Sequence, residues 1–146
     1  MSPEMLAYRK AARVVVLIQA GIRESASLLD RPAFPPFRPL DRKTAEEIAT
    51  AELASHAAEQ RFNPREAGWA IEQARIARQL LRPFVSSDQE LQRNLSRLRL
   101  AARKQIENPV TWRKIRAVAD ELLTQVRLTA SDVAEICSQV ESTLRP

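Results

Sequence analysis

Residues 7–18 read Ala-Tyr-Arg-Lys-Ala-Ala-Arg-Val-Val-Val-Leu-Ile, a basic and alanine-rich segment that continues into an apolar one. The tripeptide Ser2-Pro3-Glu4 lies just upstream of it. This tripeptide combines an N-cap residue, a proline suited to the first helical position and an acid that favours the helix dipole. These residues predict a first helix that runs to about Leu28.

Five further helices are predicted from recurring start and stop signals, in which a capping residue is followed by a proline or an acid. A proline-rich connecting arm, about 30–40, separates the first two helices, because such proline density excludes a helix and any central strand. The expected helices run from about 41–44 to 60, from Asn63-Pro64-Arg65-Glu66 to Pro83, from Ser87 and Glu90 to about Asn108, from Asn108-Pro109 onward, and over a short segment opened by Thr129 and Asp132.

Apolar residues recur at helical spacing in the later helices, which predicts the faces that form the core. We find no convincing strand and no internal repeat. The predicted core faces are Ile71, Ala74, Ala77 or Arg78, and Leu81 in the third helix, Leu91, Leu95, Leu98 and Ala102 in the fourth, and Ile115, Val118, Ala119 and Leu122 in the fifth.

The composition favours an all-α fold. Only 2 of 146 residues are glycine and 5% are aromatic, which predicts one compact domain, 1–146, of about six helices with little or no sheet. The single cysteine, Cys137, excludes an internal disulfide and favours a reducing compartment. Since the chain has no apolar run of ~20 residues and no recognisable leader, we expect a cytoplasmic protein that does not bind a membrane.

Four segments, taken in order, carry a resemblance to a known family. Together they resemble the peptidase domain of the membrane-anchored, ATP-dependent zinc metallopeptidases of the FtsH type, over nearly the whole chain. The alternative is an unrelated all-α domain. The four segments are Ala7-Tyr8 with Ala11 and the run Val14 to Ile18; Leu53 to Gln60; Ala70 to Arg78; and Val118 to Leu123 with Leu128, Asp132, Val133 and Ile136.

The chain departs from this family where the chemistry lies. A helical HExxH motif supplies two zinc-ligating histidines and a general-base glutamate. The resemblance places Arg9, Lys10 and Arg13 at these three positions, and Ala70 at that of the third ligand, an aspartate. The resemblance therefore implies a degenerate peptidase domain that is not an enzyme and holds no metal and no cofactor. The family's ATPase domain and membrane anchor are not recognised in the chain either.

Arg9 and Arg13 lie one turn apart on one helix face. If they were buried in a former metal pocket, they would need carboxylate partners or an anion. We expect instead that the pocket is partly open or that these side chains reach solvent, and a bound anion is the alternative.

Other residues with chemical potential have plainer interpretations. His56 and Cys137 cannot by themselves rebuild a three-ligand zinc site, and we expect a satisfied or surface histidine and a cysteine that packs as a small hydrophobe. Trp69 and Trp112 each lie near the start of a helix and are expected to anchor the core or an interface. Trp69 is next to Ala70, so it could fill the volume of the missing metal site.

The net charge is +5, and the basic excess lies near the N-terminus and in residues 84–128, which carry nine basic and five acidic side chains. Arginines spaced four apart on a helix could neutralise phosphates and give salt-dependent binding of nucleic acid, and the alternative is a solvated face. Residues 119–136 loosely resemble a helix-turn-helix pair, but the linker is long and lacks the usual glycine. The candidate nucleic-acid contacts are Arg93, Arg97, Arg103, Lys104, Arg113 and Lys114, with Arg99 and Arg116 in the same cluster.

The leading functional hypothesis is a non-catalytic, pseudopeptidase-like interaction module. It would bind protein partners or self-associate as a homo-oligomer, since the resembled family assembles as rings. A nucleic-acid-binding protein that uses the basic helices around 93–116 is the second hypothesis. An enzyme of unrelated mechanism is the third.

Overall fold

The structure is a computed structural model that describes residues 1–29, 40–68 and 70–144. Within these residues it is an all-α fold, as predicted, and it also contains one short pair of strands. The proline-rich arm predicted at 30–40 lies almost wholly outside the described residues. The elements are α1 (Pro3–Gln19), β1 (Ala26–Ser27), α2 (Arg42–Phe62), α3 (Ile71–Leu81), the 3-10 turn η1 (Arg82–Phe84), α4 (Asp88–Glu107), α5 (Pro109–Gln125), β2 (Arg127–Leu128) and α6 (Ala130–Thr143).

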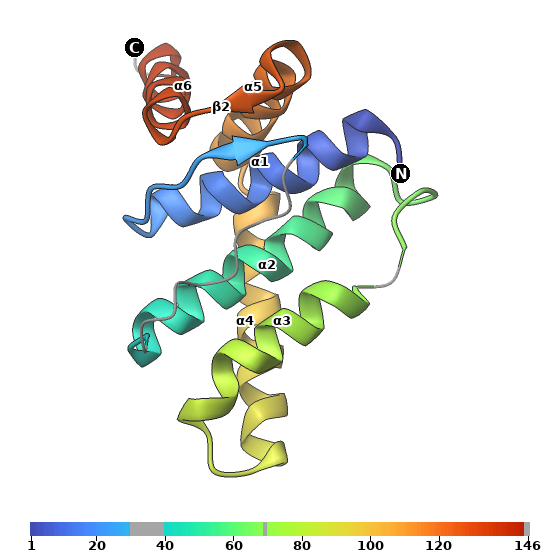
Figure 1. The fold of residues 1–146 in the computed structure, drawn as a ribbon, viewed down its shortest axis with the longest axis vertical. Helices are drawn as coiled ribbons and strands as arrows, with labels where there is room; N and C mark the ends of the chain where they lie inside the picture. Colours follow the sequence, from blue (N-terminus) through green and yellow to red (C-terminus); the bar gives the residue numbers. More distant parts are fainter. Residues whose placement is uncertain (30–39, 69, 145–146) are drawn as a thin grey trace.

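Helix α1 is central to the packing. It lies between α2 and α5, while α2 in turn packs on α3 and α4 (Figure 1). Helix α6 packs mainly on α5, at the opposite end of the molecule from the start of α4. Apolar residues of all six helices form one continuous core. None of the described helices is long and apolar enough to cross a membrane.

Several helices begin where the sequence predicts. The Ser2 hydroxyl accepts from the Met5 N–H at 3.1 Å, and the Ser87 hydroxyl accepts from the Glu90 N–H at 3.1 Å. Thr129 and Asp132 form a complete capping box at the start of α6. The predicted core faces of α4 and α5 are buried in full. Capping and apolar spacing therefore define these helices locally.

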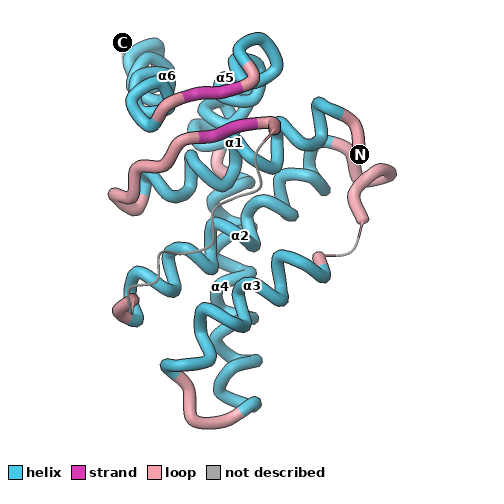
Figure 2. The backbone as a smooth tube through the Cα atoms, in the orientation of Figure 1, coloured by secondary structure: helices cyan, strands magenta, loops and turns pink. Residues whose placement is uncertain are grey.

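The first helix is shorter than predicted, because α1 ends at Gln19 instead of near Leu28. Gly21 follows with φ +86°, a left-handed conformation that glycine adopts without a steric penalty. The chain then reverses, and Ala26–Ser27 pairs antiparallel with Arg127–Leu128 in the two-residue ladder drawn in magenta in Figure 2. The sequence did not predict this ladder, since two-residue strands carry no periodic signal.

The third helix begins later than predicted. The Asn63 side chain accepts from the backbone N–H groups of Arg65 and Glu66, but the turn that it forms does not continue as a helix. Instead, the Glu66 carboxylate accepts from the Ser2 N–H at 2.7 Å and fastens this turn to the start of the chain. Helix α3 begins only at Ile71, which is 73% exposed, so its predicted core position was wrong.

The second helix also differs in its cap. The predicted start lay between Asp41 and Thr44, with Thr44 and Glu47 spaced as a capping box. In the structure the Asp41 carboxylate accepts from the Thr44 N–H at 2.7 Å, so Asp41 is the N-cap. This hydrogen bond lowers the pKa of Asp41 from its ordinary value.

Candidate functional site

The side chain of Arg13 is buried between α1 and α2. Only 8% of the residue is exposed, and its guanidinium forms an ion pair with Glu52 of α2, which is also buried. A second carboxylate, Glu24 in the loop after α1, lies 3.2 Å from Arg13 Nη2. The expectation that this arginine reaches solvent or faces an open pocket was therefore wrong. Of the two alternatives for a buried arginine, carboxylate partners or a bound anion, the structure shows carboxylate partners.

Arg9 lies one turn earlier on the same face of α1 and pairs with a different residue of α2. Its Nε donates to the Glu59 carboxylate, which is only 2% exposed, whereas the Arg9 side chain keeps 31% of its surface in solvent. Burying a carboxylate costs less when a cation pairs with it, so the Arg9 guanidinium offsets part of the cost of burying Glu59. Together, the two arginines fasten α1 to α2; we call these contacts the α1–α2 ion pairs.

The other two positions of the resembled metal site lie on α1 and just before α3. Lys10 is half-buried on α1, next to Arg9 in the chain. Ala70 is half-buried and precedes α3, where it occupies the N-cap position without a side-chain hydrogen bond. Helix α2 packs on both α1 and α3. Trp69, which was expected to fill the neighbouring volume, lies outside the described residues.

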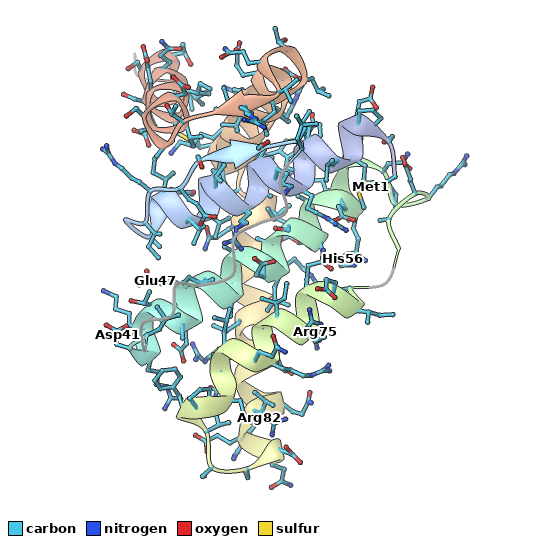
Figure 3. All side chains as sticks on the ribbon, viewed as in Figure 1. Met1, Asp41, Glu47, His56, Arg75 and Arg82 are labelled. Atoms are coloured by element: carbon cyan, nitrogen blue, oxygen red, sulfur yellow. The ribbon has the colours of Figure 1, made fainter. Side chains whose placement is uncertain are left out.

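His56, which is labelled in Figure 3, lies on α2 between Glu52 and Glu59 in the sequence. Burial lowers the pKa of His56; the nearby Glu59 carboxylate opposes this shift, and Arg9 adds to it. The imidazole is therefore held neutral in the folded protein at neutral pH. Among the residues that the structure describes, no group of three or more His, Cys, Asp or Glu side chains is arranged to hold a metal ion.

The carboxylate partners were missed by the sequence analysis, although a signal for them exists. Glu52 and Glu59 are two turns apart and therefore share a face of α2. The same helix buries mostly small residues, among them Ala51, Ala54 and Ala58. Acids on an alanine-rich buried face need cations, and the first helix offers two arginines on one face.

An aromatic cluster joins α1, α2 and α5 beside the ion pairs. The rings of Tyr8 and Phe62 are stacked with centroids 4.2 Å apart, and Trp112 lies 5.4 Å from Tyr8. The Arg61 guanidinium lies over the Trp112 ring at 4.4 Å. Trp112 packs against the core as expected. Burial, together with the Asp120 charge, raises the pKa of Tyr8, so its hydroxyl is neutral and the cluster is a structural contact.

Cys137 is the remaining candidate nucleophile. Its side chain is buried in the core, where it packs as a small hydrophobe, as predicted. Burial raises the pKa of the Cys137 thiol, although the Lys114 charge opposes the shift. A thiol with a raised pKa is a poor nucleophile at neutral pH.

The basic residues predicted to contact nucleic acid are split by the fold. Lys114 is buried and forms an ion pair with Glu141 of α6 at 2.5 Å, so it cannot lie on a binding surface as predicted. Arg97 is exposed, but its Nη2 lies 2.6 Å from the Glu46 carboxylate of α2. The other predicted contacts are exposed on α4 and at the start of α5: Arg93, Arg103, Lys104 and Arg113, along with Arg99 and Arg116.

Two open grooves complete the described surface features. One, of about 550 Å³, lies among α1, α2, α4 and α5 and is lined mainly by polar side chains such as Gln19, Glu47 and Lys104. The other, of about 500 Å³, lies between α5 and α6 and has acidic side chains such as Glu121 and Glu135 in its lining. Neither groove contains Arg9, Arg13 or Ala70.

The sequence matches no model of a known protein family, and no curated protein matches it either.

Proposed function

We propose that this protein is a non-catalytic interaction module, built on a scaffold that resembles an FtsH-type zinc metallopeptidase domain, which binds protein partners or self-associates. The observation that supports the proposal is the pairing of Arg9 and Arg13 with Glu59 and Glu52. At two of the positions that the resemblance assigns to the metal site, those of Arg9 and Arg13, this chain has ion pairs.

The chemistry of these residues supports the same interpretation. A guanidinium stays protonated in proteins, so Arg9 and Arg13 can neither ligate a metal nor accept a proton. The buried Cys137 further suggests a reducing compartment, and we propose the cytoplasm.

The first test measures zinc and proteolysis on the wild-type protein. We expect less than one tenth of a zinc per chain after dialysis against zinc, and no cleavage of unfolded casein with or without added zinc. A preparation that cleaves casein at a rate proportional to its concentration, and loses this activity on chelation, would overturn the proposal.

The scaffold itself is tested by restoring the family's residues. The variant Arg9→His/Lys10→Glu/Arg13→His/Ala70→Asp supplies two histidines and an aspartate as zinc ligands. The Glu59 carboxylate could then accept a hydrogen bond from the ring N–H of one histidine, as carboxylates do in many zinc sites. We expect one zinc per chain and a rise in melting temperature with zinc. A matched control omits Ala70→Asp and should bind zinc more weakly. A folded quadruple variant without zinc affinity would count against the resemblance.

A second candidate function, nucleic-acid binding, is favoured by the exposed basic side chains of α4. With three or four phosphate contacts, affinity for duplex DNA should fall by roughly tenfold to a hundredfold between ~50 and ~200 mM salt. The variant Arg93→Gln/Arg99→Gln/Arg103→Gln should reduce both affinity and salt dependence. The control Arg65→Gln/Arg78→Gln changes exposed arginines elsewhere. Equal binding by both variants would dismiss this function.

A further inference from the structure

The groove between α5 and α6 has a distinctive lining. Its apolar residues include Ala117, Leu128, Ile136 and Val140, and no basic side chain lines it. Four carboxylates belong to the same lining, namely Asp120, Glu121, Asp132 and Glu135. In the described part of the chain, none of these four forms an ion pair with a basic side chain. An apolar surface among unneutralised acids is suited to a ligand that is both apolar and cationic.

The exposed face of α4 is basic, in contrast to the acidic groove between α5 and α6. Leu100 is 52% exposed at its centre, although the protein offers a core that could bury it. Arg97, Arg103 and Lys104 lie three or four residues from Leu100, which places them around it on the same face, and Arg93 lies two turns before it. All four basic residues are exposed. We call Leu100 with these four residues the α4 basic face.

Within one molecule the groove and the α4 basic face cannot meet. Helix α6 packs mainly on α5 and α4 packs mainly on α2, and the two helices belong to different parts of the molecule in Figure 1. The complementary surfaces are therefore available to a neighbouring molecule. The segment that contains α6 is itself acidic, because residues 129–146 carry one basic and three acidic side chains.

We propose that the α5–α6 groove binds the α4 basic face of a second copy of this chain. Leu100 would lie against the apolar residues of the groove, and the surrounding arginines would lie near its carboxylates. This inference rests on the proposed function, and it names the partner and the surface. Because the two patches differ, each contact is head-to-tail, and a pair of molecules can close only if both grooves are filled.

The test uses charge reversal in two variants. Glu121→Lys/Glu135→Lys leaves two acidic and two basic side chains in the groove, and Arg93→Glu/Arg103→Glu leaves two basic and two acidic side chains on the α4 basic face. Each variant alone then has one charged patch and one patch of zero net charge, so sedimentation velocity should show at least about tenfold weaker association than wild type. An equimolar mixture of the two variants should associate more strongly than either variant alone, because the unchanged α4 basic face of the groove variant meets the unchanged groove of the α4 variant.

Controls separate this interface from general charge effects. Arg65→Glu/Arg78→Glu changes net charge as much as the α4 variant does, and it should associate like wild type. Leu100→Ala, at an exposed position that cannot unfold the protein, should weaken association. Wild-type association should also weaken between ~50 and ~500 mM salt, since it depends on charged groups near the surface.

The results distinguish this inference from the proposed function. A wild-type protein that stays monomeric at low salt, reversal variants that associate as well as wild type, or a mixture that fails to associate overturns the inference. Each of these results leaves the zinc and proteolysis measurements untouched. Conversely, zinc-dependent cleavage by wild type overturns the proposed function whatever the oligomeric state is.

Discussion

The ion pair between Arg9 and Glu59 is asymmetric, because the carboxylate is buried whereas the arginine is partly in solvent. If Glu59 is neutralised, Arg9 can turn into water. If Arg9 is removed, a charged carboxylate is left inside the protein. The two partners therefore contribute unequally to stability, even though they share one contact.

We expect Arg9→Met to destabilise the protein by about 3 kcal/mol and Glu59→Gln by only about 1 kcal/mol. The double variant should resemble Glu59→Gln, because no buried charge remains to be compensated. Urea denaturation of the three variants and the wild type measures these values. Equal losses for the two single variants would show that the carboxylate is solvated or otherwise paired.

His56 gives the protein a pH dependence of known sign. Its pKa is lowered in the folded protein, mainly by burial, so the unfolded chain binds the proton more readily. The free energy of unfolding should therefore fall as pH drops below about 6.5, the ordinary pKa of histidine, and level off below the folded pKa.

His56→Gln removes this proton while keeping a polar side chain. Between pH 7 and pH 5 the variant should lose less stability than wild type in thermal unfolding followed by circular dichroism. Carboxylates such as Asp41, whose pKa is also lowered, titrate alike in both proteins and cancel in the difference. Parallel pH profiles would mean that His56 is as well solvated folded as unfolded.

At the scale of the elements, the junction between α5 and β2 has an unusual backbone. Val126 caps α5 with φ 67° and ψ −33°, a conformation that a β-branched residue rarely adopts. Its N–H donates to the Leu122 carbonyl at 2.7 Å, and its carbonyl accepts from the Leu28 N–H at 3.0 Å. These two backbone hydrogen bonds hold Val126 in its strained conformation.

Val126→Gly should stabilise the protein by about 1 kcal/mol, because glycine adopts positive φ without a steric penalty. Gln125→Gly is the matched control. Residue 125 is the last helical residue, so glycine there should be neutral or destabilising by up to about 1 kcal/mol. Chemical denaturation midpoints compare the two, and a Val126→Gly variant that is no more stable than Gln125→Gly would show that the strain is absent.

Two Asn-Pro pairs show how far local signals predict these helices. Asn108 accepts from the Val110 and Thr111 N–H groups and starts α5, as predicted. Asn63 makes the same contacts, yet no helix follows it. The difference comes from the Ser2–Glu66 contact, between residues 64 positions apart, and from Gly68, a poor helix former. A cap can be predicted from sequence, but whether a helix follows depends on distant residues.

The candidate site shows the same limit. The sequence predicted that Arg9 and Arg13 share a face, which follows from helical spacing alone. It did not predict that α2 supplies their carboxylates, because which helices pack together is decided by the whole core. The degree of burial was wrong for Arg13 for the same reason.

At the scale of the molecule, stability should be distributed unevenly. Helix α1 is packed between α2 and α5, whereas α6 packs mainly on α5 and is fastened by its capping box and by the Lys114–Glu141 ion pair. Helices with fewer packed neighbours open at lower free energy than the core does. We expect the amide protons of α6 to exchange before those of α1.

The rate at which the Cys137 thiol on α6 reacts with a thiol reagent measures this opening. Since burial raises the pKa of its thiol and shields it, native protein should react with a thiol reagent far more slowly than unfolded protein does. Thr129→Ala weakens the cap of α6 by about 1 kcal/mol and should speed the reaction several-fold. The control Ser87→Ala weakens α4 instead. Equal acceleration by both variants would mean that α6 opens only with global unfolding.

The position of α1 also bears on how the protein is made. A ribosome synthesises α1 before α5, but one side of α1 is covered by α5, which begins about 90 residues after α1 ends. Until α5 has left the exit tunnel, the apolar run Val14 to Leu17 has only part of its packing. Nascent chains that stall before α5 is synthesised would therefore expose the apolar residues of α1. Such chains should bind chaperones that recognise apolar segments.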